Sequence, residues 1–203
     1  MTRLPDAVSF IDQARGGDAE ALNQLVERYS SYLTLLARTQ IGRRLQGKVD
    51  PGDVVQETLL EMHRQFPQFR GETEPELLAW MRRILAGQIA LTVRRFFGTK
   101  GRDVTLEQQL AVQLDESSQA IDGGLAASTS TPSQRASRRE QAVLLAEALD
   151  KLPKDYREVI ILRHLEQRSF AEVASRMGRS EDSVQKLWVR ALASLRKSLG
   201  GLS

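Results

Sequence analysis

Apolar residues recur at three- and four-residue intervals along most of this chain, and this period constrains the fold more than any other feature. Between Asp18 and Gly42 they are Leu22, Leu25, Val26, Tyr29, Leu33 and Leu36. Such spacing puts them on one side of a helix that buries that side. Aromatic residues are only 5% of the sequence, so any core must be mostly Leu, Ile, Val and Ala. With little strand-like alternation, we expect an all-α protein.

Capping residues mark where the first helices should begin and end. Asp18 is expected to cap a helix that Gly42 ends, because aspartate accepts from free backbone N–H groups and glycine tolerates the turn after a helix. Asp50 and Pro51 have the form of a cap followed by proline at the first helical position. The helix they start should stop at Pro67. Its expected buried residues are Val54, Val55, Leu59 and Met62.

Two capping boxes start later helices. The first, from Thr73 to Glu76, opens a long helix that ends near Gly98. The second, from Ser169 to Glu172, opens a short helix that ends at Gly178. Before the second box, QAVLLAEALDKL and DYREVIILRHLE are expected to be helices. Ser180 should cap the last helix of the chain.

The composition changes between the two sets of helices. Residues 117–137 are rich in Ser, Ala, Gly and Thr and offer little apolar surface to bury. We therefore expect two small helical domains, at 5–98 and 139–200, joined by a flexible linker over 99–138.

Charge is distributed unevenly along the chain. Asp50 to Glu76 holds seven acids and two arginines, whereas Arg82 to Arg102 holds six basic residues and no acid. Residues 151–203 hold eleven basic residues and six acids. The basic blocks suit nucleic acid and the acidic block suits a basic protein surface. Solvated helix faces would give similar runs, so charge alone leaves both interpretations open.

The last two helices have the pattern of a helix-turn-helix. Such a unit needs a small residue where the helices cross, a glycine at the turn and two apolar residues to fix the crossing. Ala174, Gly178, Val184 and Leu187 stand at those places, with Val173 and Met177 completing the buried side. Val184, Leu187, Trp188, Ala191 and Leu195 should form the core stripe of the last helix. A plain helical hairpin with a solvated face is the alternative.

A second segment, from Trp80 to Arg102, interleaves basic and aromatic residues. Arginines surround a buried stripe, and Phe96 and Phe97 follow. Rings that stack on bases, beside cations that meet phosphates, suit single-stranded nucleic acid. Alternatively the three aromatic residues are core, which is the favoured interpretation for Trp80.

Residues 53–71 and the segment WMRRILAGQIA at 80–90 resemble conserved region 2 of sigma factors, and residues 152–197 resemble region 4. No segment between them resembles region 3, so the chain is similar to the extracytoplasmic-function (ECF) group. The resemblance implies a two-domain factor that binds core RNA polymerase at the β′ coiled coil and the β flap. It also implies binding to promoter DNA, as duplex and as melted strand, and leaves open control by an anti-sigma factor.

The resemblance assigns three sets of residues. The set for the polymerase coiled coil is Asp53, Gln56, Glu57 and Glu61. The set for the −10 element, including a loop that captures a flipped base, is Phe69, Arg70, Gly71, Trp80, Arg83, Gly87, Gln88, Arg94 and Arg95. The set for the −35 element is Arg179, Ser183, Gln185, Lys186, Val189 and Arg190. Many members carry Asn near Gly87, and Arg at the places of Gln185 and Leu187.

Other classes of protein fit the sequence less well. There is no cysteine, and the two histidines, His63 and His164, have no metal-ligand spacing. Without a phosphate loop or a nucleophile elbow, we expect no enzyme, metal or cofactor. With no apolar run of signal-peptide or membrane-span length, we expect a cytoplasmic protein without a membrane partner. A dimeric operator-binding repressor or activator and a helical adaptor remain the alternatives.

Overall fold

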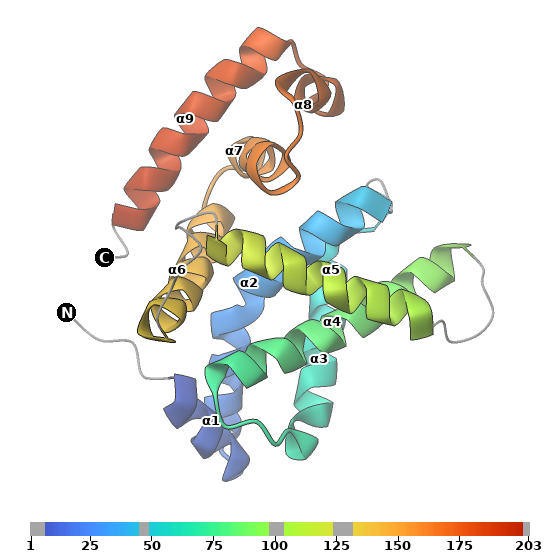
Figure 1. Ribbon diagram of the computed structural model, residues 1–203, viewed down its shortest axis with the longest axis vertical. Helices are drawn as coiled ribbons and strands as arrows, with labels where there is room; N and C mark the ends of the chain where they lie inside the picture. The colour runs from blue at the N-terminus through green and yellow to red at the C-terminus, as the bar shows by residue number, and fades with distance from the viewer. Residues whose placement is uncertain (1–6, 45–48, 98–103, 124–131, 201–203) are drawn as a thin grey trace. The chain divides into compact units, whose positions relative to one another are not determined.

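The computed structural model describes residues 7–44, 49–97, 104–123 and 132–200, and these residues contain helices and no strand (Figure 1). The expected all-α class is therefore confirmed. The chain divides into two compact units, Met1–Glu116 and Ser117–Ser203. No described helix is both long enough and apolar enough to cross a lipid bilayer.

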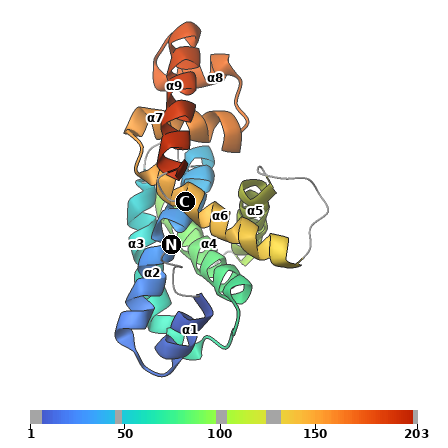
Figure 2. The ribbon, with the colours of Figure 1, turned by 90° about the vertical axis from the view of Figure 1, so that its left-hand side faces the viewer.

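The first unit is a bundle built around α2 (Ala19–Arg44). This helix packs against α1 (Ala7–Arg15), α3 (Pro51–Gln65) and α4 (Glu74–Phe97), and α3 also packs against α4 (Figures 1 and 2). The sequence pattern gave no indication of α1, which buries Ile11. The largest fully buried side chains of the bundle include Tyr29, Leu33, Leu36, Met62, Leu85 and Ile89.

The predicted caps of this unit are confirmed by their hydrogen bonds. Oδ1 of Asp18 accepts from the backbone N–H groups of Glu20 and Ala21, at 2.9 and 3.2 Å. Oδ1 of Asp50 accepts from the N–H of Gly52 at 2.8 Å. The first capping box closes in both directions, between Thr73 and Glu76.

Two predicted boundaries shift slightly. Gly42 does not end α2, which continues to Arg44, because glycine permits a helix end but does not impose one. The helix α3 ends at Gln65 and is followed by η1 (Phe66–Gln68), a 3-10 turn that contains Pro67.

The predicted linker needs a larger correction. The helix α5 (Val104–Gly123) lies within residues 99–138, and α6 (Pro132–Asp150) begins before their end. The linker was predicted from the composition of residues 117–137, whereas α5 begins at Val104 and buries Leu110 and Leu114, one helical turn apart. Residues 104–116 belong to the first unit.

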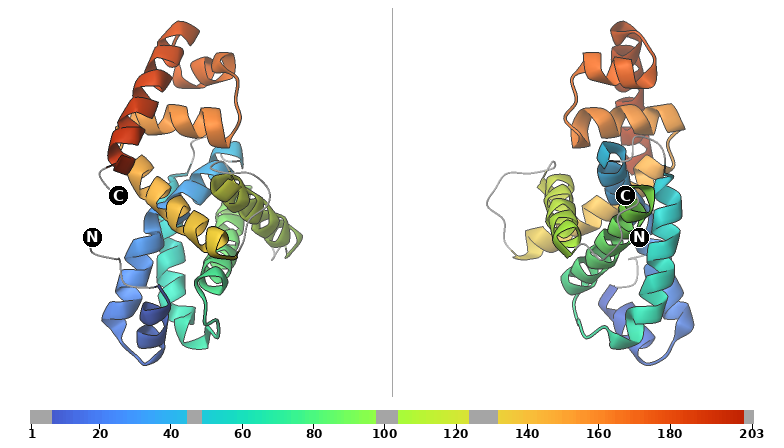
Figure 3. Two further views of the ribbon diagram at one scale, coloured as in Figure 1. Left: turned by 60° about the vertical axis from the view of Figure 1, so that its left-hand side comes forward. Right: turned by 90° about the vertical axis from the view of Figure 1, so that its right-hand side faces the viewer.

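The second unit is organised around α9 (Glu181–Gly200), which packs against α6, α7 (Lys154–Ile160) and α8 (Phe170–Met177) (Figure 3). The helix predicted for DYREVIILRHLE is interrupted. After α7, residues Ile161–Leu165 form η2, a single π-helical stretch that carries His164. Its Ile161 and Leu162 are buried in the core of the unit.

Candidate nucleic-acid interfaces

The turn between α8 and α9 has the geometry that the sequence predicted for a helix-turn-helix. Ser169 and Glu172 form both hydrogen bonds of the capping box at the start of α8. Gly178 ends that helix in the left-handed region at φ 63°, where a side chain would be strained. Val184 and Leu187 are buried on the facing side of α9. The two helices are thus held at a fixed crossing by the residues expected to hold it.

An aromatic cluster joins α9 to the preceding helices. The indole N–H of Trp188 donates to Nε2 of His164 at 3.0 Å, and the two rings stack at 5.8 Å. Phe170 meets Trp188 edge-on at 5.6 Å, and Arg163 lies over the Phe170 ring at 4.5 Å. Trp188 remains partly exposed, so it is less completely core than predicted. The cluster fixes the rotation of α9 about its axis, and with it the direction of the outward face.

The outward face of α9 is polar and open. Gln185, Lys186 and Arg190 are exposed, and Val189 is 59% exposed. The Lys186 ammonium pairs with Asp182 on the same helix at 2.7 Å, with both side chains largely in solvent. Such a pair is worth little and leaves the lysine available to a ligand.

Two predicted members of this face have further contacts. Arg179, in the turn before α9, forms an ion pair with Asp155 of α7. This ion pair links the turn to α7. Ser183 is half-buried, and its backbone N–H donates to the hydroxyl of Ser180 at 3.3 Å, which confirms the predicted cap. Structurally, therefore, these two residues sit at the margin of the face.

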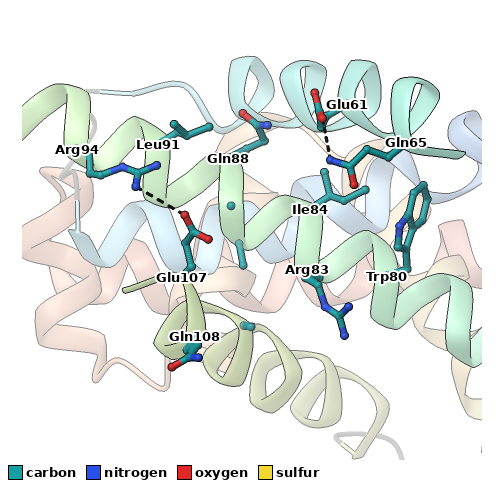
Figure 4. A pocket seen from close by; sticks show the side chains of 13 residues that line it. Glu61, Gln65, Trp80, Arg83, Ile84, Gln88, Leu91, Arg94, Glu107 and Gln108 are labelled. Carbon is teal, nitrogen blue, oxygen red and sulfur yellow. Dashed lines mark hydrogen bonds and ion pairs between the residues drawn. The ribbon is translucent and has the colours of Figure 1, made fainter. Parts of the chain in front are cut away.

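In the first unit, residues of α3, α4 and α5 surround a groove of about 920 Å³ (Figure 4). Five residues of α4 that were assigned to the −10 element line this groove, together with Glu61 of α3. Three residues of α5 complete the wall, and the sequence gave no signal for them. The groove residues from the −10 set are Trp80, Arg83, Gly87, Gln88 and Arg94, and those from α5 are Glu107, Gln108 and Ala111.

Glycine at position 87 leaves part of this groove open. A Cβ added there would meet nothing within 4 Å. The position is therefore free to accept the Asn that many family members carry. Glycine is therefore not required here to avoid a clash with a neighbouring atom, and the absence of a side chain makes the groove wider at this position.

The loop before α4 is fixed by aromatic packing. The rings of Phe69 and Trp80 lie 5.0 Å apart, and Phe66 completes the cluster. Phe69 is only 6% exposed, so its ring packs beneath the surface of the loop and supports it. A Cβ on Gly71 would lie 2.4 Å from the Phe69 ring, which explains the glycine. Arg70 is exposed, but its guanidinium donates to the carbonyl of Pro67 at 2.8 Å.

The arginines of α4 divide into two pairs. Arg83 and Arg95 are exposed and form no ion pair with any residue that the structure describes. Arg82 and Arg94 instead pair with acids of α5, Asp115 at 2.6 Å and Glu107 at 3.7 Å. The sequence could not anticipate these pairs, because it gave no helix at α5.

The aromatic residues of α4 do not all belong to the core. Phe96 and Phe97 are 49% and 66% exposed, which contradicts the interpretation of both as core. Trp80 is half-buried between the cluster and the groove. Rings are therefore presented beside the arginines, as single-stranded nucleic acid would require.

The acidic helix α3 carries the set of residues predicted to bind the polymerase. Asp53, Gln56 and Glu57 are exposed on one face, where Leu60 is also 54% exposed. Glu61 borders the groove and accepts from the side-chain amide of Gln65 at 2.7 Å (Figure 4). Glu61, one helical turn after Glu57, lies at the edge of this face that borders the groove.

No cluster of three or more His, Asp or Glu side chains suited to a metal ion occurs in the described part of the chain. Burial, with a smaller contribution from the Arg163 charge, lowers the pKa of His164. That shift favours the neutral imidazole that accepts from Trp188. The described site residues are equipped for binding through charge, stacking and hydrogen bonds.

Comparison with known proteins defines the class. The family model "Sigma-70, region 4" matches residues 142–195, which include α8 and most of α9. The ECF RNA polymerase sigma-E factor of Haemophilus influenzae is 28% identical over 170 residues, covering 83% of this chain and 82% of that one. The ECF RNA polymerase sigma-E factor of Escherichia coli K12 is 27% identical over 175 residues, which cover 86% of this chain and 84% of that protein. The solved complex of CnrH with the cytosolic domain of CnrY aligns with 98% of this chain and 100% of that chain, at 25% identity and a TM-score of 0.37.

The helix-turn-helix of the second unit is therefore a sigma-70 region 4. The chain belongs to the sigma-70 family of RNA polymerase sigma factors, in the extracytoplasmic-function group, and directs promoter-specific transcription.

Proposed function

We propose that this sigma factor divides promoter recognition between two helices, α9 for the duplex −35 element and α4 for the −10 element. The observation that carries the proposal is the contrast between the two sides of α9. Val184 and Leu187 are buried, whereas Gln185, Lys186 and Arg190 are exposed. Glutamine pairs with adenine and lysine with guanine in the major groove, and arginine also meets phosphate.

The −10 element fits the groove beside α4. Melted DNA offers unstacked bases and flexible phosphates, which the Trp80 ring and the exposed Arg83 suit. The loop at Arg70 and Gly71 borders the same aromatic cluster. In this proposal Phe69 has a supporting role, because its ring is buried. Opening of the −10 duplex is favoured when these residues hold a flipped base.

Core polymerase is proposed to bind the exposed face of α3 formed by Asp53, Gln56 and Glu57, through the coiled coil of β′. Exposed acids attract a basic partner and accelerate its association. Glu61 is better placed to shape the groove wall. The second unit is proposed to bind the β flap as well, and control by an anti-sigma factor is part of the same expectation. The protein acts in the cytoplasm by binding, with no catalytic step of its own.

Co-purification with core enzyme tests the polymerase face. The double variant Asp53→Lys, Glu57→Lys should lose most of its binding to core, while the exposed Glu27 of α2 provides the control variant Glu27→Lys. Unchanged capture of the double variant would overturn the assignment of α3. Mapping of transcription start sites with reconstituted holoenzyme then supplies the −10 and −35 sequences for the other two assignments.

A further inference from the structure

The helix α5 has the charge that the face of α4 would attract. Residues 104–123 include four acids, Glu107, Asp115, Glu116 and Asp122, and no lysine or arginine. The helix α4 carries Arg82, Arg83, Arg94 and Arg95. An acidic helix therefore lies against a basic one, in the unit that holds residues 104–116.

Two ion pairs join these helices at separate points. The Arg82 guanidinium donates to Asp115 at 2.6 Å, and Arg94 lies 3.7 Å from Glu107. The hydroxyl of Tyr32 also accepts from Arg82, at 3.3 Å. Figure 4 shows the carboxylate of Glu107 directed at Arg94 across the groove. A carboxylate at that place occupies the cation that a DNA phosphate would need.

The attachment of α5 is small. Leu110 and Leu114 are its fully buried side chains between residues 104 and 116. Asp115 is half-exposed, so its pair with Arg82 is open to solvent and weakened by salt. The Arg94–Glu107 pair is more enclosed, with side chains 12% and 20% exposed, and the side-chain amide of Gln40 donates to the backbone carbonyl of Gln113 at 3.4 Å. Because Leu110 and Leu114 are the fully buried side chains described in residues 104–116, this segment should be displaced at lower cost than the core helices of its unit.

We propose that residues 104–116 of α5 act as an intramolecular competitor of single-stranded DNA on α4. In the free chain Glu107 and Asp115 neutralise Arg94 and Arg82, and Glu107, Gln108 and Ala111 close one side of the groove. DNA binds there when this part of α5 has left. The inference rests on the proposed role of α4 and adds its regulation. By linkage, whatever holds α5 elsewhere raises the affinity of α4 for DNA.

The alternative is that α5 is a permanent wall of the −10 site. In that case Glu107 would stay beside the DNA, and its charge would oppose phosphate binding without any release. The two cases differ in whether DNA and α5 exclude each other, and this difference is measurable.

The first experiment measures fluorescence anisotropy of a labelled, mixed-sequence single-stranded DNA with the full chain at fixed low salt. The double variant Glu107→Gln, Asp115→Asn removes both carboxylate charges and keeps the side-chain shapes. It should bind about 3- to 10-fold more tightly than the wild type, as expected when two ion pairs stop holding a competitor. The control Glu27→Gln, Glu116→Gln changes net charge equally at exposed positions and should change affinity less than twofold.

The variant Arg83→Ala distinguishes a failure of the competition by α5 from a failure of the proposed DNA-binding role of α4. Arg83 faces the groove and forms no ion pair with the described residues of α5. If Arg83→Ala weakens DNA binding but the double variant matches its control, the competition is wrong and the proposed role of α4 stands. If Arg83→Ala leaves affinity unchanged, the proposed −10 face falls, and the competition falls with it.

Hydrogen–deuterium exchange of the wild-type chain gives a second test that needs no variant. Amides of residues 104–116 should exchange faster when saturating single-stranded DNA is added, because bound DNA displaces the helix. Amides of the buried α2 core serve as the internal reference. Equal or greater protection of residues 104–116 in the complex would overturn the proposal.

Discussion

The two helices that carry the proposed DNA faces, α4 and α9, differ in what their cations already contact. On α9, Lys186 pairs with an exposed acid of its own helix, and the outward residues are open to solvent. On α4, Arg82 and Arg94 pair with acids from a helix distant in sequence. A basic run in a sequence therefore predicts a nucleic-acid face, but the structure decides whether that face is available. In this protein the proposed duplex-binding face of α9 is open to solvent, and the proposed face of α4 for single-stranded DNA is partly covered.

The two units also differ in how their tryptophans are held. Trp188 contacts His164 and Phe170 from two other elements, whereas Trp80 packs on Phe66 and Phe69, which immediately precede its own helix. In the second unit, the Trp188 side chain therefore links α9 to η2 and α8. In the first unit, the cluster around Trp80 fixes only the loop that precedes α4.

The largest expected effect is the loss of Trp188. Trp188→Ala should lower the free energy of unfolding of the second unit by about 2–4 kcal/mol, below the full range for buried aromatics because the ring is partly exposed. Thermal denaturation followed by circular dichroism measures it. The neighbouring Val189→Ala is the control, expected within about 0.5 kcal/mol of the wild type because that side chain is largely in solvent. Equal stability of the two variants would mean that α9 is oriented differently.

A matched pair of glycine substitutions tests the −10 region. Gly71→Ala should destabilise the first unit by about 1–3 kcal/mol, because the new methyl group overlaps the Phe69 ring. Gly87→Ala should instead stabilise it by about 0.5–1 kcal/mol, since alanine is the better helix former and meets no neighbour. Urea denaturation monitored by Trp80 fluorescence in a Trp188→Phe background would compare them. The opposite order of stabilities would contradict the packing of the loop.

Substitutions on α9 distinguish base reading from phosphate contact. Gln185→Ala should change which −35 sequences are selected, with a loss of about 1–3 kcal/mol of discrimination at one position. Arg190→Ala should weaken binding to all sequences nearly equally and reduce the salt dependence. Binding-site selection with each holoenzyme measures both. An unaltered −35 preference in variants of both Gln185 and Lys186 would remove the assignment.

The smallest expected effect is a pH dependence confined to the second unit. Burial lowers the pKa of His164 below its ordinary value of 6.5, so the unfolded chain binds this proton more readily than the folded one. Stability should therefore decline as pH falls from about 6.5 toward the lowered pKa, because protonation removes the acceptor of the Trp188 N–H. Chemical denaturation at a series of pH values should show this decline, and His164→Gln should abolish it. A wild-type profile flat down to the carboxyl range would refute the contribution of His164.

Acid should affect both units at lower pH. Glu76 and Glu172 accept from the backbone at their helix starts, and these hydrogen bonds lower the pKa of each carboxyl below 4.5. Their contribution to stability is present above that value and disappears as pH falls through the lowered pKa. The units should thus differ near pH 6 and lose their capping boxes together in acid.

The sequence by itself determined the features that depend on neighbours along the chain. Caps at Asp18 and Asp50, both capping boxes and the left-handed turn at Gly178 follow from a few adjacent residues, because a helix end is satisfied locally. The same is true of the buried and outward sides of α9, since helical period alone separates Val184 from Gln185.

Only the tertiary structure decided which distant residues meet. The pairs of Arg82 with Asp115 and Arg94 with Glu107, the burial of Phe69 and the place of Glu61 at the border of the groove depend on how helices pack. The linker predicted over 99–138 passed over α5, because a marginal helix is stabilised by its docking surface more than by its own propensity. Periodicity names the side of a helix that is buried, but it carries no information about which partner buries it.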